Sequence, residues 1–218
     1  MNTGGAIALV TGANRGLGRA FARGLLARGA HTVYAAARDP RTVTGPGLTP
    51  LALDITDPAS VAAAAERCPD TTPMVNNTGI LRGDSLLTAD SLDGLAMCRA
   101  FAPVLGKNGG GALVNVLSVL SWHTLPQIGS YGVSKAAAWS MTNAVREELR
   151  AQGTLTVAVH AACIDTDMAA HVDQTKISPA DVVGQVLDAV EADREEVLAD
   201  DVTRQARAML SRGANHDH

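Results

Sequence analysis

Short apolar runs alternate along the chain with longer stretches of helical spacing. Seven runs are short and mostly apolar, and each predicts a β-strand: residues 6–11, 31–37, 51–53, 74–76, 112–117, 155–160 and 196–198. The intervening sequence predicts helices at 15–28, 57–67 and 131–152, one that opens at Ser178-Pro179, and one at the C-terminus. This alternation predicts an α/β fold with a mainly parallel sheet flanked by helices. A length of 218 residues favours a single domain spanning 1–218.

A glycine-rich turn separates the first predicted strand from the first predicted helix. Glycines stand at positions 12, 16 and 18, where they permit positive φ and let backbone N–H groups approach a pyrophosphate at the positive end of the helix. The spacing Gly-x-x-x-Gly-x-Gly differs from the Gly-x-Gly-x-x-Gly fingerprint. A lone glycine turn is often only a tight turn, but its place at this strand–helix junction favours a dinucleotide site.

The end of the second predicted strand indicates which dinucleotide is bound. An acidic residue there would accept a hydrogen bond from the ribose 2′-hydroxyl of NAD, but this chain has Ala37 followed by Arg38. Asp39 comes one position too late and precedes Pro40. The guanidinium of Arg38, with Arg15 as a second cation, is expected to pair with a 2′-phosphate, which favours NADP(H). The alternative is that either arginine is a solvated surface residue.

Tyr131 and Lys135 stand four positions apart, and Ser118 precedes the tyrosine by thirteen. On a helix, positions i and i+4 share one face, so the ammonium is expected beside the phenol, where positive charge favours the phenolate. Lowering the pKa of a tyrosine from about 10 to about 7 requires roughly 4 kcal/mol. The pair by itself also fits a buried tyrosine and a solvated lysine. The predicted dinucleotide site favours an acid/base unit.

Composition narrows the classes of function. The net charge of −4 is spread along the chain, so no nucleic-acid partner is expected, and no apolar run is long enough to cross a membrane. Three widely spaced cysteines predict a reduced, cytoplasmic protein without disulfides, and the six scattered histidines predict no protein-bound metal. An apolar strand begins within six residues of the N-terminus without a cationic leader, so no signal peptide is expected.

Taken together, these segments resemble the short-chain dehydrogenase/reductase family over nearly the whole chain. The matching segments are residues 11–18, Asp54-Ile55, Asn76-Asn77-Thr78-Gly79, the Ser118, Tyr131 and Lys135 set, and residues 164–168. The resemblance implies a Rossmann-like, doubly wound fold. It also implies a homodimer or tetramer that acts on a small-molecule carbonyl compound or alcohol.

The resemblance assigns roles to individual residues. Tyr131 would be the general acid in reduction and the base in oxidation, and Ser118 would hydrogen-bond the carbonyl oxygen. Lys135 would lower the pKa of the phenol and bind the nicotinamide ribose. The implied cofactor-binding residues are Gly12, Asn14, Arg15, Gly16, Leu17, Gly18, Arg38, Asp54, Ile55, Asn76, Thr78, Gly79, Tyr131, Lys135, Ile164 and Thr166.

The chain also departs from the family pattern. The family asparagine of the proton relay has no counterpart in the short interval between positions 79 and 118, because Asn108 falls in a glycine loop and Asn115 on a strand. Within this interval, only residues 95–105 predict a helix. The sequence leaves open whether the shortening of the interval is natural, engineered or due to absent residues. Ala161-Ala162 also replaces the family's Pro-Gly. An alternative is therefore a weakly active NAD(P)-binding regulatory protein of the same fold.

The substrate side is expected to be small and apolar. Residues 168–177 predict a short lid with few charges, and Trp122, His123 and Leu125 are expected to line one wall. His123 or His171 would aid polar recognition, although surface placement is favoured for both, and Cys163 is predicted to be inert packing. The expected substrate is therefore an apolar ketone, aldehyde or secondary alcohol.

Overall fold

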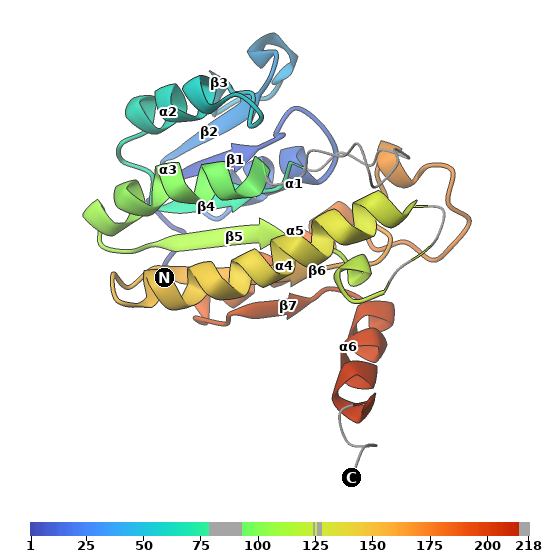
Figure 1. Cartoon of the computed structure of the whole chain (residues 1–218). Helices are drawn as coiled ribbons and strands as arrows, with labels where there is room; N and C mark the ends of the chain where they lie inside the picture. The colour runs from blue at the N-terminus through green and yellow to red at the C-terminus, as the bar shows by residue number, and fades with distance from the viewer. Residues whose placement is uncertain (79–92, 124, 126–127, 214–218) are drawn as a thin grey trace.

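A computed structural model of the chain describes residues 1–78, 93–123, 125 and 128–213. Its centre is a seven-stranded parallel sheet with the strand order β3-β2-β1-β4-β5-β6-β7 (Figure 1). The strands are β1 Ile7–Thr11, β2 Thr32–Ala37, β3 Leu48–Ala52, β4 Pro73–Asn76, β5 Ala112–Val116, β6 Leu155–His160 and β7 Glu196–Leu198. The predicted doubly wound α/β fold is confirmed.

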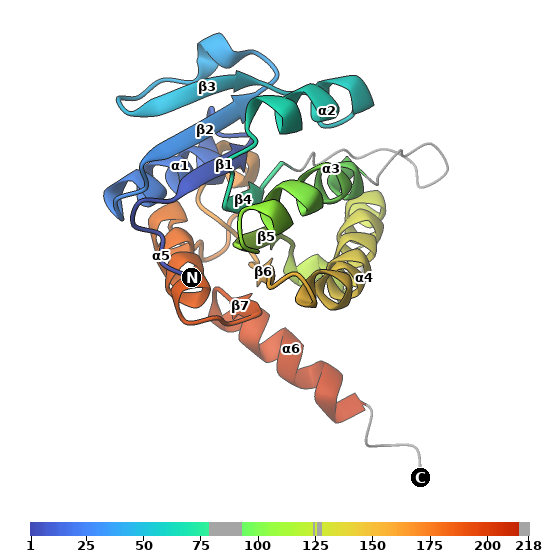
Figure 2. The same cartoon turned by 90° about the vertical axis from the view of Figure 1, so that its left-hand side faces the viewer.

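Helices cover both faces of the sheet. They are α1 Gly16–Ala27, α2 Pro58–Arg67, α3 Asp93–Lys107, α4 Gly129–Arg150, α5 Pro179–Glu191 and α6 Asp201–Gly213. Among the described residues, short 3-10 turns are η1 Pro40–Thr42, η2 Val119–Ser121 and η4 Asp167–Ala169. Figure 2 shows α1 and α5 on one face and α2, α3 and α4 on the other, while α6 extends away from the sheet. The sheet is therefore buried on both sides except at its ends.

Each face of the sheet has its own core. Val10 on β1 packs with Phe21 of α1 in the core shared with α5, whereas the neighbouring Leu9 packs with Phe101 of α3 on the opposite face. This alternation follows from the two-residue period of a strand. Because both faces are buried, the strands show as continuous apolar runs in the sequence, which is why they were predictable.

Some element boundaries differ from the prediction. Strand β3 begins at Leu48, three positions earlier than expected, and includes Pro50. A proline is tolerated there because β3 lies at the edge of the sheet, where one side of the strand needs no hydrogen-bond donor. Helix α3 runs from Asp93 to Lys107, which is fifteen residues, so it extends beyond the predicted 95–105 at both ends. It contains Pro103.

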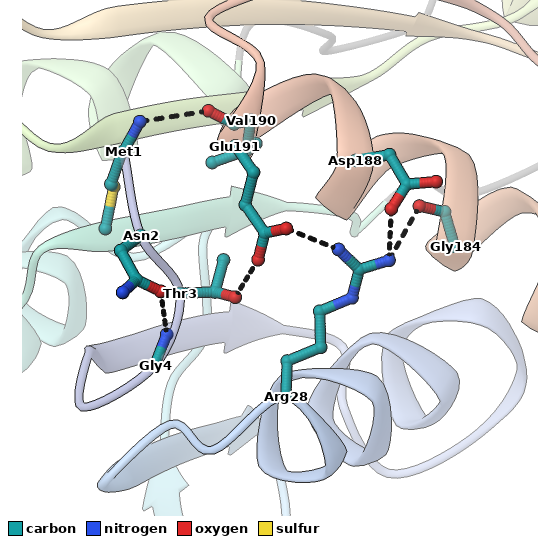
Figure 3. A network of polar contacts seen from close by, with 9 residues as sticks. All are labelled: Met1, Asn2, Thr3, Gly4, Arg28, Gly184, Asp188, Val190 and Glu191. Carbon is teal, nitrogen blue, oxygen red and sulfur yellow. Dashed lines mark hydrogen bonds and ion pairs between the residues drawn. The ribbon is translucent and has the colours of Figure 1, made fainter.

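A polar network at the amino ends of the strands ties α1 to α5 (Figure 3). Arg28, directly after α1, donates to Glu191 at 2.9 Å and to Asp188 at 2.5 Å. Thr3 also hydrogen-bonds Glu191, which brings the N-terminal segment into the same network. This network fixes helix positions at the end of the sheet that is far from the site described below.

Candidate active site

The carboxyl ends of the parallel strands place the predicted catalytic residues together. Ser118 follows β5 and caps η2, where its Oγ accepts a hydrogen bond from the Leu120 amide at 3.1 Å. Its side chain also forms a hydrogen bond with Tyr131, which α4 brings to the same place. Two segments that are separate in sequence therefore meet at the edge where open α/β sheets bind ligands.

Lys135 lies one helical turn after Tyr131, on the same face of α4. Its Nζ is 5.6 Å from the centroid of the tyrosine ring and donates to the Val116 carbonyl oxygen at 2.9 Å. The side chain is buried, and burial lowers the pKa of Lys135 to about 8. The i, i+4 geometry expected from the sequence is present, and the alternative of a solvated lysine does not hold.

The direction of the Tyr131 pKa shift differs from the expected one. Burial raises the pKa of Tyr131, and the hydrogen bond to Ser118 is the contact that lowers it. The lysine ammonium is directed to the Val116 carbonyl oxygen, and desolvation of the phenol outweighs the favourable contacts. The protein's own groups thus keep the phenol protonated at neutral pH, which is the form that donates a proton.

The glycine turn has the geometry of a phosphate-binding loop. Gly12 and Gly16 have positive φ values of 64° and 51°. A Cβ on Gly18 would lie 2.2 Å from the carbonyl oxygen of Gly12, so only glycine permits this packing of turn against helix. The N-cap residue Arg15 makes no side-chain capping hydrogen bond to α1, which leaves the first backbone N–H groups able to bind an anion.

The other predicted residues of this turn have different surroundings. The Asn14 side chain donates to the Thr42 hydroxyl at 3.1 Å, and the Arg15 side chain is exposed at the mouth of the turn. Leu17 is buried and packs in the core, so its side chain supports the turn without facing a ligand.

The loops after β1, β4 and β6 lie side by side. Thr11 Oγ1 accepts hydrogen bonds from the amides of Asn77 and Thr78, both at 3.0 Å, and the Asn77 side chain donates to the Thr11 carbonyl at 2.9 Å. Gly16 and Thr166 are neighbours across the turn, since a Cβ added to Gly16 would lie 3.5 Å from the Thr166 methyl group. The predicted Gly79 lies outside the described residues.

Asn77 was missed as a site residue, although it stands second in the Asn76-Asn77-Thr78-Gly79 motif. Its side chain ties the loop after β4 to the end of β1, and its amide nitrogen lies beside Gly12 and Gly18. Asn77 therefore supports the glycine turn. The signal in the sequence was its position directly after the predicted fourth strand.

Asn76 faces a buried polar chain. Its amide donates to Asn115 Oδ1 at 3.0 Å, and the Asn115 amide donates to the Thr142 hydroxyl on α4 at 3.0 Å. Asn76 and Asn115 are register partners on β4 and β5, which is why their side chains meet. The chain joins two strands to the helix that carries Tyr131. Sequence reasoning set Asn115 aside as a strand residue.

At the end of β2, an exposed arginine is followed by an aspartate that is already paired. Arg38 is exposed directly after the strand. Asp39 is engaged elsewhere, because its carboxylate accepts hydrogen bonds from the Arg41 amide and side chain at 3.0 and 2.9 Å. Asp54 accepts from the Thr56 amide and hydroxyl, and the amide contact is the main reason its pKa is lowered. Ile55 follows it and is half-buried.

A cavity of about 450 Å³ lies beside Ser118. Among its lining residues are His123 and Leu125, as predicted, together with Val172 from the segment expected to form a lid. Trp122 does not line it and instead stacks on His160, with ring centroids 4.1 Å apart. Cys163, predicted to be inert packing, lines this cavity.

His160 is a buried residue that sequence reasoning passed over. It ends β6, and its Nδ1 hydrogen-bonds the Ser118 carbonyl oxygen at 3.2 Å, so it supports the backbone at Ser118. Its Nε2 is buried without a hydrogen-bond partner among the described residues. Burial lowers the pKa of His160 to about 4. Its place as the last residue of a predicted strand was the available signal.

We expect this histidine to make stability depend on pH. Its pKa in the folded chain is about 4, below the usual value of about 6.5, so between these values the unfolded chain binds the extra proton. The free energy of unfolding should therefore fall by about 3 kcal/mol as the pH drops through this window. Denaturant unfolding of the wild type and His160→Gln measures the slope, which the variant should flatten. His31→Gln, at an exposed position, is the control.

Two properties of the described segments concern metal binding and membrane crossing. No three His, Cys, Asp or Glu side chains there gather in an arrangement able to bind a metal ion. No helix within the same segments is both long and apolar enough to cross a bilayer.

Comparison with known proteins identifies the family. The family model for short chain dehydrogenases matches residues 6–177. The chain belongs to the short-chain dehydrogenase/reductase family. A crystal structure of a short chain dehydrogenase from Burkholderia cenocepacia in complex with NADP is 38% identical, with a TM-score of 0.91, covering 99% of this chain and 98% of that one.

Curated members of the family are also similar to this short-chain dehydrogenase/reductase. The short chain dehydrogenase tazN of Aspergillus terreus is 34% identical over 198 residues, and the match covers 77% of this chain but 43% of the relative. The short chain dehydrogenase pigC of Monascus ruber is 32% identical over 197 residues, and the match covers 75% of this chain and 64% of the relative. The chain thus spans less than two thirds of these two relatives. The 3-oxoacyl-(acyl-carrier-protein) reductase FabG of Vibrio harveyi is 31% identical, with 77% of each chain covered.

Proposed function

We propose that the protein is an NADP(H)-dependent oxidoreductase that interconverts a carbonyl compound and an alcohol. One observation carries this proposal: Ser118, Tyr131 and Lys135 converge at the carboxyl edge of the sheet, next to a glycine turn suited to a dinucleotide. Membership of the oxidoreductase family supports the reaction type.

In reduction, the Tyr131 hydroxyl donates its proton to the carbonyl oxygen of the substrate. Burial keeps that proton on the phenol until the oxygen gains negative charge. The Ser118 hydroxyl hydrogen-bonds the same oxygen and stabilises the charge as it develops. The Lys135 ammonium stabilises the phenolate that remains. When bound, NADPH supplies the hydride, and the protein orients the reacting groups.

The donor set fits a phosphorylated dinucleotide. The glycine turn and the start of α1 would hold the pyrophosphate, and Arg38 would pair with the 2′-phosphate. Ile164 and Thr166 would hold the nicotinamide end, since Thr166 faces Gly16 across the turn. The Burkholderia cenocepacia relative, which is bound to NADP, supports the choice of NADP(H) over NAD(H).

Replacing Arg38 with alanine should weaken NADPH binding by about 10- to 100-fold, because a hydrogen bond to a charged group contributes about 1.5–3 kcal/mol. Binding of NADH, which lacks the phosphate, should change little. Fluorescence titration with both cofactors measures the effect. Arg41→Ala is the matched control, because that arginine is exposed nearby but paired with Asp39. Equal NADPH affinity in the Arg38→Ala variant and the wild type would refute the assignment.

A second candidate is a cofactor-binding regulatory protein with little turnover. The sequence of α3 contains no asparagine, so the family's proton relay behind the lysine lacks its usual member. NADPH consumption with a panel of aldehydes and ketones, beside cofactor titration, separates the two candidates. Tight NADPH binding without turnover, unaffected by Tyr131→Phe, would favour the regulatory protein. We further propose a small apolar substrate, a homodimer or tetramer, and a cytoplasmic location.

A further inference from the structure

The cavity beside Ser118 extends along the C-terminal helix. It begins at Val119 and Leu120, directly after the serine, and reaches Ile128, three residues before Tyr131. Its volume of about 450 Å³ is within the range of small-molecule sites, roughly 300–1,000 Å³. Ser118 and Tyr131 do not line the cavity themselves, but the Ser118 hydroxyl accepts a hydrogen bond from the amide of the lining residue Leu120 at 3.1 Å. The cavity therefore adjoins the proposed catalytic serine and is large enough for a ligand group.

One face of α6 forms the far wall. Val202, Gln205, Ala206 and Met209 all line the cavity, and their spacing of i, i+3, i+4 and i+7 places them on one side of the helix. Val202 and Met209 are 56% and 61% exposed, which is unusual for large apolar side chains. Both side chains line the cavity.

The position of α6 is fixed by contacts with the active-site loops. The carboxylate of Asp200, just before the helix, accepts hydrogen bonds from the Ala162 and Thr203 amides, both at 2.8 Å. Further along, the Arg207 guanidinium lies 5.7 Å from the Trp122 ring centroid and pairs with Glu196. The first turns of α6 are thus held against the loops that follow β5 and β6.

The chemistry of the lining selects against charged ligands. Among the described residues, no Asp, Glu, Lys or Arg lines the cavity, and the only polar side chains are His123, Gln174 and Gln205. A phosphate or carboxylate group would lose its hydration there without gaining a partner. A hydrocarbon chain would bury apolar surface against Leu120 and Met209.

We propose that this cavity binds the apolar tail of the carbonyl substrate, and that α6 determines the chain length accepted. The proposal rests on the function proposed above, because it assumes that the substrate's carbonyl lies at Ser118 and Tyr131. The substrate class is an aldehyde or ketone with an unbranched aliphatic chain.

A series of straight-chain aldehydes tests the proposal. Because burial of one methylene contributes about 0.8 kcal/mol, kcat/KM should rise about fourfold per added methylene until the cavity is filled. In Met209→Glu, the rise should be lost and the longest aldehydes should react at least about tenfold more slowly, since the carboxylate opposes burial of the chain. The shortest aldehyde and NADPH affinity should be unaffected.

Ala208→Glu is the matched control. It adds the same charge at the neighbouring exposed position of α6, which does not line the cavity, and should keep the wild-type dependence on chain length. An unchanged dependence in Met209→Glu would overturn the proposal. So would a change from dimer to monomer caused by Met209→Glu in size-exclusion chromatography, because this face would then contact a second copy of the chain.

A direct binding measurement distinguishes failure of the subsite from failure of the proposed function. If the wild type reduces no aldehyde, calorimetric titration with 1-decanol in the presence of NADP⁺ still tests the cavity. Binding that is lost in Met209→Glu and kept in Ala208→Glu would support the subsite without catalysis. Equal binding by both variants, or no binding by the wild type, would overturn it.

Discussion

Tyr131→Phe is expected to lower kcat for carbonyl reduction by about 10²- to 10⁴-fold, the usual contribution of general acid catalysis. The substitution removes one hydroxyl, which hydrogen-bonds Ser118, and leaves the aromatic ring beside Lys135 in place. NADPH affinity should fall only slightly, because the glycine turn and Arg38, which would hold the phosphate groups, are untouched. Steady-state kinetics with the best aldehyde of the panel, together with fluorescence titration of NADPH, measures both quantities.

The chain provides a matched control for this substitution, since it contains only two tyrosines. Tyr34 lies on β2, and its hydroxyl hydrogen-bonds Asp70 at 3.3 Å, away from the site. Tyr34→Phe removes the same group and should leave kcat unchanged. Equal turnover by Tyr131→Phe and the wild type would contradict the role of the phenol as the proton donor.

Gly18→Ala is expected to destabilise the fold and the cofactor turn together. The new Cβ would lie 2.2 Å from the Gly12 carbonyl oxygen and 2.6 Å from Asn77 Nδ2, so the turn and helix α1 must separate. Overpacking of this kind costs about 1–3 kcal/mol, and the contact with rigid backbone places this case at the upper end. Because the same turn would hold the pyrophosphate, NADPH affinity should fall at least about tenfold, or about 1.4 kcal/mol.

Gly184→Ala is the control for that substitution. Gly184 lies inside α5, and a Cβ there meets no atom within 4 Å. Alanine is preferred in a helix interior by about 0.5–1 kcal/mol, so the control should raise the free energy of unfolding slightly. Denaturant unfolding and NADPH titration of both variants measure the contrast. Normal stability and cofactor affinity in Gly18→Ala would show that the turn is not packed as described.

The sheet was predictable because its strands are buried on both faces, so each one is a short apolar run in the sequence. The edge strand β3 was placed too late because Pro50 interrupts its apolar pattern, and only the finished sheet shows that an edge tolerates it. The bounds of α3 were also underestimated. Propensity within a window does not reveal how far tertiary packing extends a helix.

The site was predictable as far as local geometry decides it. The spacing of Tyr131 and Lys135 placed both on one helix face, and the glycine spacing identified the turn. The direction of the Tyr131 pKa shift was not predictable, because it depends on burial, which no local pattern reports. The pairing of Asn76 with Asn115 likewise depends on the register of β4 and β5, whose partners are far apart in sequence.

Transfer of deuterium from cofactor to product tests the central claim most directly. NADPH deuterated at both C4 positions is mixed with excess protein and an aldehyde in ordinary water, and the product alcohol is analysed by mass spectrometry. The account predicts one deuterium on the former carbonyl carbon of the product, formed by the wild type and largely abolished in Tyr131→Phe. Tight NADPH binding without any deuterated alcohol would contradict it.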